Sequence, residues 1–421
     1  METNYILEMR HISKSFPGVK ALDDVTLCVR PGTVHSLMGE NGAGKSTLMN
    51  CLFGIYSKDS GEIILDGEKV NFHSPSEALN NRVSMVHQEL NQVPNQTVME
   101  NLWLGRFPLK YKLIDEKRIY EKTKEIFDDL EIDIDPKMKV GSLKVSQKQM
   151  IEIAKAVSYD SKIIVMDEPT SSLTEREVEH IFQIINKLVN KGSSIIYISH
   201  KMEEILRISN DVTVMRDGKW ISTNPARELT TDNIIQKMAG RELKDRYPKR
   251  NAKVGKVMLE VKNLSSAAPC FKNVSFELHS GEIIGIAGLV GAKRTEILEI
   301  LFGLRKKGEG EIIVNGKKVE NRNPREAMAN GFAMLTEERR LDGIFAGQSV
   351  RFNTTIANMK KYEKHGLLKE SSMRNDSNKM ISTMKIKTPS EKNKIENLSG
   401  GNQQKVILGR WLLTDPEILL L

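Results

Sequence analysis

The chain is poor in cysteine and contains no long hydrophobic run, and each absence excludes a class of protein. Its three cysteines, Cys28, Cys51 and Cys270, are odd in number and far apart. They therefore indicate neither a disulfide framework nor a cysteine-based metal site. No apolar stretch approaches the roughly 18 residues that a membrane-spanning helix needs. The first residues also lack the basic start and apolar segment of a signal peptide, so we expect a working site in the cytosol.

The rest of the composition is that of a globular protein. Its 421 residues predict two or three domains. The hydrophobic fraction of 39% and the charged fraction of 28% are ordinary values. The net charge of +8 would suit nucleic acid or an anionic membrane face, but a solvated basic surface explains it as well.

The most informative segment is a glycine-rich loop that follows the apolar run 34–38. Residues 39–46 match the phosphate-binding pattern G-x-x-x-x-G-K-[ST] at every fixed position, and a helix is predicted over 46–53. The glycines let backbone N–H groups face a polyphosphate at the helix N-terminus. Lys45 would neutralise the β and γ phosphates, and Ser46 would hold Mg²⁺. The expected nucleotide-binding residues are Gly39, Glu40, Asn41, Gly42, Ala43, Gly44, Lys45, Ser46 and Thr47.

An internal repeat organises the whole chain. Four blocks recur in the same order, pairing 24–32 with 273–281, 39–46 with 288–295, 52–54 with 301–303, and 61–67 with 310–316. In each copy, β-branched runs alternate with helical patterns, which predicts an α/β fold: a mostly parallel sheet with flanking helices. We expect domains at 1–240 and 257–421.

The segment 241–256 between the copies is predicted to be a basic linker. It contains Pro248 and shows no apolar periodicity. A DNA-binding arm is possible, but an exposed tether fits better because no aromatic residues are interleaved for base stacking.

Three further polar groups follow predicted strands of the first copy. The run 163–166 is apolar, as a central parallel strand should be, and it leads into Asp167 and Glu168. Ligands of open α/β sheets bind at such strand ends. Asp167 suits Mg²⁺, and Glu168 suits a base that orients a water molecule. His200 and Gln88 follow two other apolar runs; alone, His200 would suit a structural hydrogen bond and Gln88 carries little information.

The order of these motifs resembles that of the ATP-binding-cassette (ABC) ATPases. The resemblance covers nearly the whole chain and implies that ATP and Mg²⁺ are the cofactors. It assigns Gln88 to the loop that contacts both Mg²⁺ and the attacking water, Glu168 to the catalytic base and His200 to the switch histidine. Phe16 sits where the family stacks an aromatic ring on adenine.

Both copies contain a segment at the position of the family's signature, but only one of the two segments is close to the signature sequence. Residues 398–402 read Leu-Ser-Gly-Gly-Asn, which is close to the family pattern, and assign Ser399, Gly400 and Gly401 to the nucleotide. Residues 143–147 read Leu-Lys-Val-Ser-Gln. In this family the halves face each other head to tail, so each ATP meets one copy's loop and the other copy's signature. Glycines there let N–H groups approach the γ-phosphate.

The departures from the family pattern gather on one of the two expected sites. In the second loop, Lys293 replaces the final glycine, Arg294 replaces the lysine, and Glu337 stands at the position of Gln88. The facing signature is the one that carries Lys144, Val145 and Ser146. We therefore expect that one site hydrolyses ATP and that the other mainly stabilises the closed dimer.

The second copy is expected to be incomplete. Asp167 follows Leu143 by 24 residues, and the same spacing from Leu398 falls one position beyond Leu421. The final apolar run would then be the second magnesium-site strand, ending before its aspartate. We expect lower stability than in a full pair of cassettes, since unpaired inner strands expose apolar edges.

Two cassettes in one chain resemble the ATPases of bacterial sugar importers. The segments that carry this likeness are 14–22, 288–295 and 336–340. It implies a monosaccharide importer, with galactose or methyl galactoside as the expected sugar, although ribose and xylose importers share most of the layout. The expected partners are a permease, as a homodimer of transmembrane subunits that docks near residues 91–105, and a separate sugar-binding protein. The ATPase would be peripheral, on the cytoplasmic side of the cell membrane.

Two other functions remain open at this point. One is a twin-cassette ATPase that acts on ribosomes or in DNA repair, although the translation-linked proteins carry a longer insertion between cassettes. The other is a nucleotide-binding module without turnover.

Overall fold

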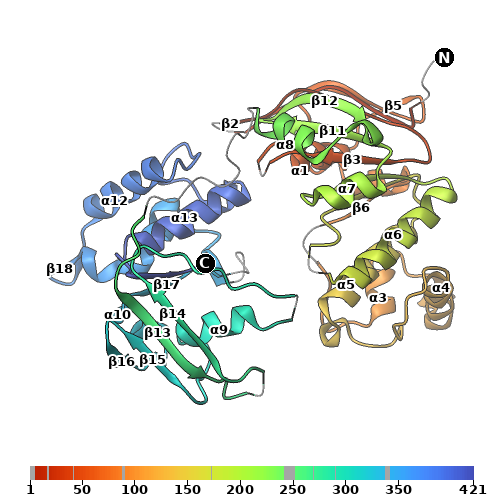
Figure 1. The fold of residues 1–421 in the computed structure, drawn as a ribbon. Helices are drawn as coiled ribbons and strands as arrows, with labels where there is room; N and C mark the ends of the chain where they lie inside the picture. The colour runs from red at the N-terminus through yellow and green to blue at the C-terminus, as the bar shows by residue number, and fades with distance from the viewer. Residues whose placement is uncertain are drawn as a thin grey trace. The chain divides into compact units, whose positions relative to one another are not determined.

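The computed structural model consists of two compact units, Met1–Lys244 and Asp245–Leu421 (Figure 1). It describes residues 5–16, 19–40, 42–87, 91–171, 173–240, 252–268, 270–289, 291–336 and 342–421. Most of the expected linker lies outside these ranges. Among the described helices, none combines the length and the apolar character needed to cross a bilayer.

The first unit is built on a six-stranded, mainly parallel sheet with the strand order β12-β11-β3-β10-β9-β6. All neighbours run parallel except β12, which pairs antiparallel with β11. Every residue of β3, β9 and β10 is buried, as expected for inner strands. The strands are β3 (Val34–Met38), β6 (Val83–Val86), β9 (Ile163–Asp167), β10 (Ser194–Ile198), β11 (Asp211–Arg216) and β12 (Lys219–Pro225).

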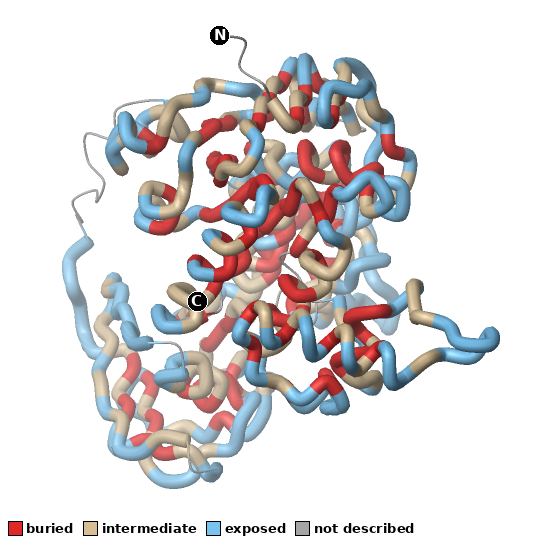
Figure 2. The backbone as a smooth tube through the Cα atoms, turned by 90° about the vertical axis from the view of Figure 1, so that its right-hand side faces the viewer, coloured by how far each residue is buried: buried red, intermediate tan, exposed pale blue. Residues whose placement is uncertain are grey.

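A second, antiparallel sheet covers one face of the parallel one. Its order is β2-β1-β4-β5, from β1 (Leu7–Phe16), β2 (Val19–Val29), β4 (Ser60–Leu65) and β5 (Glu68–Val70). Alternate residues of β9, such as Ile163 and Val165, pack with this sheet and with α1 (Lys45–Leu52). Ile164 and Met166 face the opposite way and pack in a separate core with the helices. In Figure 2 the buried stretches are short and alternate with intermediate and exposed ones along the backbone.

Except for α2 (Pro75–Asn80), whose Ala78 packs in the same core as α1, the remaining helices of the first unit pack on the other face of the sheet. Packing joins α3, α4 and α5 into a helical region that Figure 1 shows at one end of the unit. A short hairpin of β7 (Leu109–Lys110) and β8 (Leu113–Ile114) lies in the chain between α3 and α4. The helices are α2 (Pro75–Asn80), α3 (Val98–Leu102), α4 (Glu116–Asp129), α5 (Val145–Val157), α6 (Glu175–Asn190), α7 (Met202–Ile208) and α8 (Thr231–Ala239).

The second unit repeats much of this plan. It has an antiparallel sheet of order β14-β13-β15-β16 and a parallel pair, β17 and β20. The strands are β13 (Val257–Leu264), β14 (Val274–His279), β15 (Glu311–Val314), β16 (Lys317–Val319), β17 (Phe332–Met334), β18 (Glu363–Lys364), β19 (Leu367–Leu368) and β20 (Ile418–Leu420). The helices are α9 (Arg294–Leu301), α10 (Pro324–Ala329), α11 (Val350–Thr355), α12 (Glu370–Thr383) and α13 (Gly400–Leu412).

The predicted α/β class is confirmed, with two differences in the sheets. Each unit adds an antiparallel sheet that the alternation of strands and helices did not indicate. In the second unit, the described residues 282–289 form no strand, although they follow β14 as β3 follows β2, and Ile283 is exposed. In the first unit β3 is held between β10 and β11, and the described residues of the second unit form no counterpart of those two strands.

Candidate functional site

The glycine-rich loop lies between β3 and α1, as the sequence predicts. Gly44 is the N-terminal cap of α1 and has a left-handed backbone with φ of 97°. A Cβ on Gly44 would lie 2.7 Å from the carbonyl oxygen of Ala21. Gly42 also has positive φ, at 87°, but a Cβ there would meet nothing within 4 Å. Packing within the fold therefore requires a glycine at position 44. At position 42 it does not, and the space beside Gly42 is open to a ligand.

Lys45, the first residue of α1, folds back over this loop. Its Nζ donates to the carbonyl oxygens of Gly39 at 2.7 Å and Glu40 at 3.1 Å. Burial lowers the pKa of Lys45, and the carboxylates of Asp167, Glu168 and Glu40 partly offset that effect. The ammonium group is thus held by two neutral carbonyls, which an anion in the loop can replace as its partner.

Ser46 and Asp167 meet at the carboxyl edge of the parallel sheet. The Ser46 hydroxyl lies 3.4 Å from Oδ2 of Asp167, the last residue of β9. Burial raises the pKa of Asp167 to about 6, the Glu168 carboxylate adds to this rise, and Lys45 and Ser46 oppose it. A carboxylate that is costly to ionise gains from a cation beside it. Hydroxyl and carboxylate oxygens are ligands that Mg²⁺ accepts.

Glu168 and His200 form a pair at the same edge. The backbone N–H of Glu168 donates to Ile198 at 2.9 Å, which fixes the turn after β9 against the end of β10. Nδ1 of His200 lies 3.2 Å from Oε1 of Glu168, and the side chains are 62% and 16% exposed, respectively. The geometry follows from the sheet register, in which Asp167 is paired with Ile198. A carboxylate and an imidazole therefore share one open edge, where both reach solvent.

Glu204 is a buried carboxylate that no sequence motif indicates, and it contacts the turns that carry this pair. Oε2 of Glu204, in α7, accepts hydrogen bonds from Thr170 at 2.7 Å, Tyr197 at 2.8 Å and Ser199 at 3.2 Å. Lys201 adds an ion pair at 3.0 Å. Burial alone would raise the pKa of Glu204, but the hydrogen bonds from Thr170, Lys201 and Tyr197 outweigh it and hold that pKa below its usual range.

This cluster connects the two turns that carry Glu168 and His200. Thr170 lies two residues after Glu168, and Ser199 lies directly before His200. Its contacts link residues up to 34 positions apart, so no local sequence pattern reveals them. A pair of carboxylates at the end of an apolar strand was the only available signal in this region.

The structure describes most of the other predicted residues of the first unit. Phe16 ends β1, and Tyr56 packs against it edge-on with ring centroids 5.2 Å apart. Ala43 is buried within the loop and Thr47 lies in the first turn of α1. Asn41 and Gln88 lie outside the described residues, as does Glu337 of the second unit.

The second loop keeps the shape of the first with different chemistry. Lys293 caps α9 in a left-handed conformation with φ of 67°, at the position of Gly44. A non-glycine residue there is strained. Nζ of Lys293 forms an ion pair with Glu296 of the same helix at 3.1 Å, so its charge is already partnered within α9. Arg294 takes the position of Lys45.

The two signature turns also differ. Ser399 caps α13, and Nδ2 of Asn402 donates to its Oγ at 2.9 Å. A Cβ on Gly401 would meet nothing within 4 Å, so packing inside this unit does not require a glycine. In the first unit, Lys144 caps α5 and the branched, exposed Val145 stands where Gly400 stands in the second.

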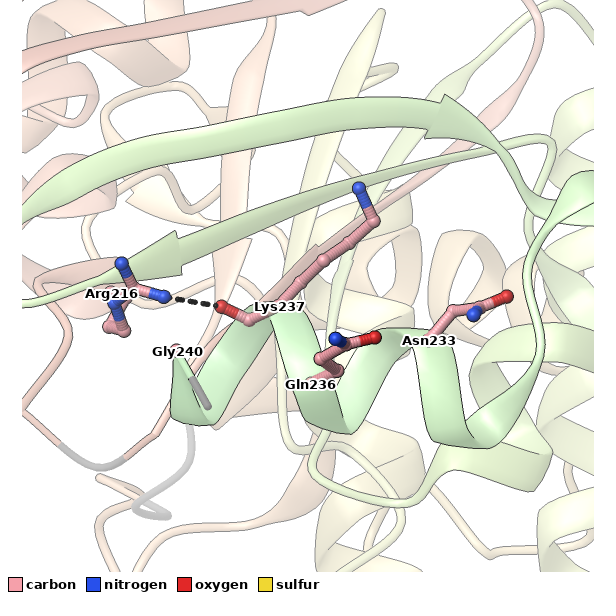
Figure 3. A pocket seen from close by; sticks show the side chains of 5 residues that line it. All are labelled: Arg216, Asn233, Gln236, Lys237 and Gly240. Atoms are coloured by element: carbon pink, nitrogen blue, oxygen red, sulfur yellow. Dashed lines mark hydrogen bonds between the residues drawn. The ribbon is translucent and has the colours of Figure 1, made fainter. Parts of the chain in front are cut away.

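A surface hollow of about 400 Å³ lies elsewhere on the first unit. Figure 3 shows its lining from β11 and α8, where Nη1 of Arg216 donates to the carbonyl oxygen of Lys237 at 3.1 Å. None of the predicted nucleotide residues lines this hollow. Within the described ranges there is also no cluster of three or more His, Cys, Asp or Glu side chains that would hold a metal ion.

Comparison with known proteins assigns the family. A family model described as ABC transporter matches residues 22–171 and 271–421. The chain is 62% identical over 421 residues to the galactose/methyl galactoside import ATP-binding protein MglA of Clostridium perfringens, covering 100% of this chain and 82% of the relative. It is 60% identical to the protein of that name from Fusobacterium nucleatum, covering 99% and 84%.

Solved structures agree with the fold. The crystal structure of the ADP conformation of MJ1267, an ATP-binding cassette of an ABC transporter, is 27% identical with a TM-score of 0.51. It covers 58% of this chain and 100% of that one, which is the share expected for a single cassette.

Proposed function

The chain belongs to the ABC transporter family, and from that premise we propose that it is the ATP-hydrolysing subunit of a bacterial monosaccharide importer. Galactose or methyl galactoside is the proposed sugar, because the relatives that are 58–62% identical carry import of those sugars in their names. We propose cassettes at 1–240 and 257–421, joined by a linker at 241–256.

The loop 39–46 is the proposed binding site of the triphosphate. Its N–H groups and the N-terminus of α1 suit phosphate oxygens. Lys45 already points into the loop and would exchange its two carbonyl contacts for the β and γ phosphates. We assign Gly39, Glu40, Asn41, Gly42, Ala43, Gly44, Lys45, Ser46 and Thr47 to the nucleotide, with Phe16 stacked on the base.

The residues present fit Mg²⁺ that arrives with the nucleotide. Ser46 and Asp167 supply two oxygen ligands 3.4 Å apart, and we assign Gln88 as a third. Six oxygens surround Mg²⁺, so phosphate and water must supply the rest. Bound Mg²⁺ would neutralise charge that develops on the phosphates.

Glu168 is the proposed catalytic base. It would orient the attacking water, with His200 as a donor to the γ-phosphate and Gln88 as a further contact. The pair is already assembled, with 3.2 Å between Nδ1 of His200 and Oε1 of Glu168. We also propose that Ser399, Gly400 and Gly401 contact nucleotide phosphates, because the space at Gly401 is open.

The partners are proposed from the same relatives. An import ATPase acts through permease subunits, so we propose a peripheral position on the cytoplasmic side of the cell membrane. We propose a permease homodimer that docks near residues 91–105 and a separate sugar-binding protein.

One observation supports this function most directly. The phosphate-loop residues and Asp167 lie at the same sheet edge as the Glu168–His200 pair. The test is phosphate release by the purified chain with Mg²⁺ and ATP. Glu168→Gln keeps the shape of the side chain and removes its charge, so it should lower turnover by about a hundredfold or more while ATP still binds. Equal turnover in the wild type and Glu168→Gln would refute the assignment of the base.

A further inference from the structure

A short hairpin of the first unit presents apolar side chains to solvent. β7 pairs with β8 through Leu109–Ile114 and Lys110–Leu113, and the N–H of Asp115 donates to Pro108 at 2.9 Å to close its base. Four apolar side chains of this hairpin are between 53% and 90% exposed: Leu109, Tyr111, Leu113 and Ile114. Apolar side chains this exposed on one protrusion indicate an interaction surface.

The turn that joins the two strands is unusual for the residues it contains. Tyr111 and Lys112 have φ of 52° and 66°. Positive φ at both central residues defines a turn that favours Asn-Gly, so a tyrosine and a lysine are strained there. The strained pair places an aromatic ring and an ammonium group together at the tip.

The second unit carries a hairpin at the corresponding place in its helical region. β18 and β19 lie between α11 and α12 as β7 and β8 lie between α3 and α4. The turn residues His365 and Gly366 again have positive φ, and Leu367 is 76% exposed, with Leu368 beside it. The two hairpins align without a gap, and Leu113 of the first corresponds to Leu367 of the second. An exposed apolar side chain therefore stands at the same position in both copies.

The first hairpin is basic. Residues 107–114 contain Lys110 and Lys112 and no acidic residue, whereas the second hairpin, residues 363–368, contains one glutamate, Glu363, and one lysine, Lys364. Alternating lysine and apolar side chains on a protruding tip suit the boundary between lipid headgroups and acyl chains. Lysine stems can lie along the apolar layer while the ammonium groups reach lipid phosphates, and tyrosine is favoured at that depth.

We propose that the first hairpin, residues 109–114, binds the surface of an anionic lipid bilayer, independently of the permease. The proposal rests on the proposed function only for placing the protein at a membrane. Leu109, Tyr111, Leu113 and Ile114 enter the headgroup region, and Lys110 and Lys112 contact lipid phosphates. The surface is distinct from the residues near 91–105 that we expect to meet the permease.

Co-sedimentation of the purified full chain with vesicles tests this, with no permease present. One vesicle type contains phosphatidylglycerol and the other only phosphatidylcholine. We expect binding to the anionic vesicles and much weaker binding to the neutral ones. Lys110→Gln should weaken the partition into anionic vesicles by about fivefold, the share of one lysine near such a surface. Tyr111→Ser and Leu113→Ser should weaken it by at least as much.

Leu304→Ser is the matched control. Leu304 is half-exposed and is followed by Arg305 and Lys306, but it lies outside both hairpins, so its replacement should leave binding unchanged. The proposal is overturned if the wild type stays in the supernatant with the anionic vesicles or binds both vesicle types equally. Equal losses in Leu304→Ser and Leu113→Ser also overturn it. Phosphate release, measured separately, tests the proposed function without reference to lipid.

Discussion

Burial shifts the pKa of two side chains at the nucleotide loop, Asp167 at the end of β9 and Lys45 at the start of α1. Asp167 is the clearest case, because burial and Glu168 raise its pKa to about 6. Lys45 is affected in the opposite direction, since burial lowers its pKa. Each group therefore stabilises the other's charged form, and either would also gain from the charges of Mg²⁺ and phosphate.

His35 in β3 gives a prediction for stability against pH. Burial lowers its pKa to about 4, Nε2 lies 2.7 Å from Oγ1 of Thr213, and Nδ1 has no hydrogen-bond partner among the described residues. The unfolded chain binds a proton near pH 6.5 and the folded chain only near 4. The neutral form's contribution is therefore complete above pH 6.5 and is lost as the pH falls, by up to about 3 kcal/mol.

Urea unfolding at several pH values checks this. We expect the free energy of unfolding of the wild type to fall more steeply below pH about 6.5 than that of His35→Gln, which cannot titrate. The substitution also changes the stability at every pH, so only the slope of the free energy of unfolding with pH is compared. Parallel slopes for the two proteins would contradict the role of His35.

At the scale of single residues, the sequence predicts site residues that belong to one short, contiguous motif. Lys45 and Ser46 follow from one eight-residue pattern, and Asp167 and Glu168 from a strand that ends in two acids. The pairing of Glu168 with His200 depends on strands that meet only in the sheet. Glu204 could not be predicted, since nothing local distinguishes it from its exposed neighbour Glu203.

Among the elements, the loop between β3 and α1 contains two glycines with different roles: Gly44 is needed for packing, and Gly42 leaves space for a ligand. Gly44→Ala places a Cβ 2.7 Å from the Ala21 carbonyl at a φ of 97°. It should lower the free energy of unfolding by about 2 kcal/mol or more. Gly42→Ala has similar strain but no clash within 4 Å, so it should cost less stability. Urea unfolding compares the two, and a larger loss in Gly42→Ala would contradict this reading.

The turns after β9 and β10 should move together through Glu204. Glu204→Gln removes the charge that the hydroxyls of Thr170, Tyr197 and Ser199 share. Misplacing Glu168 and His200 should lower the turnover number by about ten- to a hundredfold with little change in the KM for ATP. Steady-state phosphate release measures both constants.

Glu203→Gln is the control for that experiment, because Glu203 is exposed and lies in the same turn of α7. Glu204→Asp keeps the charge and should restore part of the turnover. A rise in KM without a change in turnover would show that Glu204 does not position the catalytic pair.

The elements themselves were predictable to different degrees. The apolar runs of β3, β9 and β10 matched closely because each strand is buried on both faces. The antiparallel sheets were not predicted, since their strands mix buried and exposed positions with bulges, as in the pairing of β1 with β2. Residues 282–289 occupy the position of β3 in the repeat but form no strand, and the described residues of the second unit offer no counterparts of β10 and β11, the neighbours of β3.

On the scale of the whole molecule, the repeat produces two loops of one shape and different chemistry. Lys45 is held by two neutral backbone carbonyls, whereas Lys293, which takes the position of Gly44, pairs with the carboxylate of Glu296 at 3.1 Å in a strained cap. We propose that the first loop supports hydrolysis and that the second mainly supports closure. The repeat was visible in the sequence because four blocks kept their order. The hydrogen-bond partners of Lys45 and the ion pair of Lys293 could be seen only in the structure.

Phosphate release by Lys45→Ala and Arg294→Ala tests this asymmetry. Lys45→Ala should lose about a hundredfold or more of turnover, because it removes a charge that acts on the reacting phosphates. Arg294→Ala should lose far less. Equal losses would show that both loops hydrolyse ATP and would reject the asymmetry.

The most direct measurement is the binding of ATP with Mg²⁺ to the purified chain, by equilibrium dialysis, in the wild type and Lys45→Ala. Circular dichroism confirms that both proteins are folded. We expect saturable binding by the wild type that Lys45→Ala weakens at least tenfold, about the share of one charged phosphate contact. A folded wild type that retains no nucleotide, or a Lys45→Ala protein that binds as tightly, would contradict the assignment of residues 39–46 to the triphosphate.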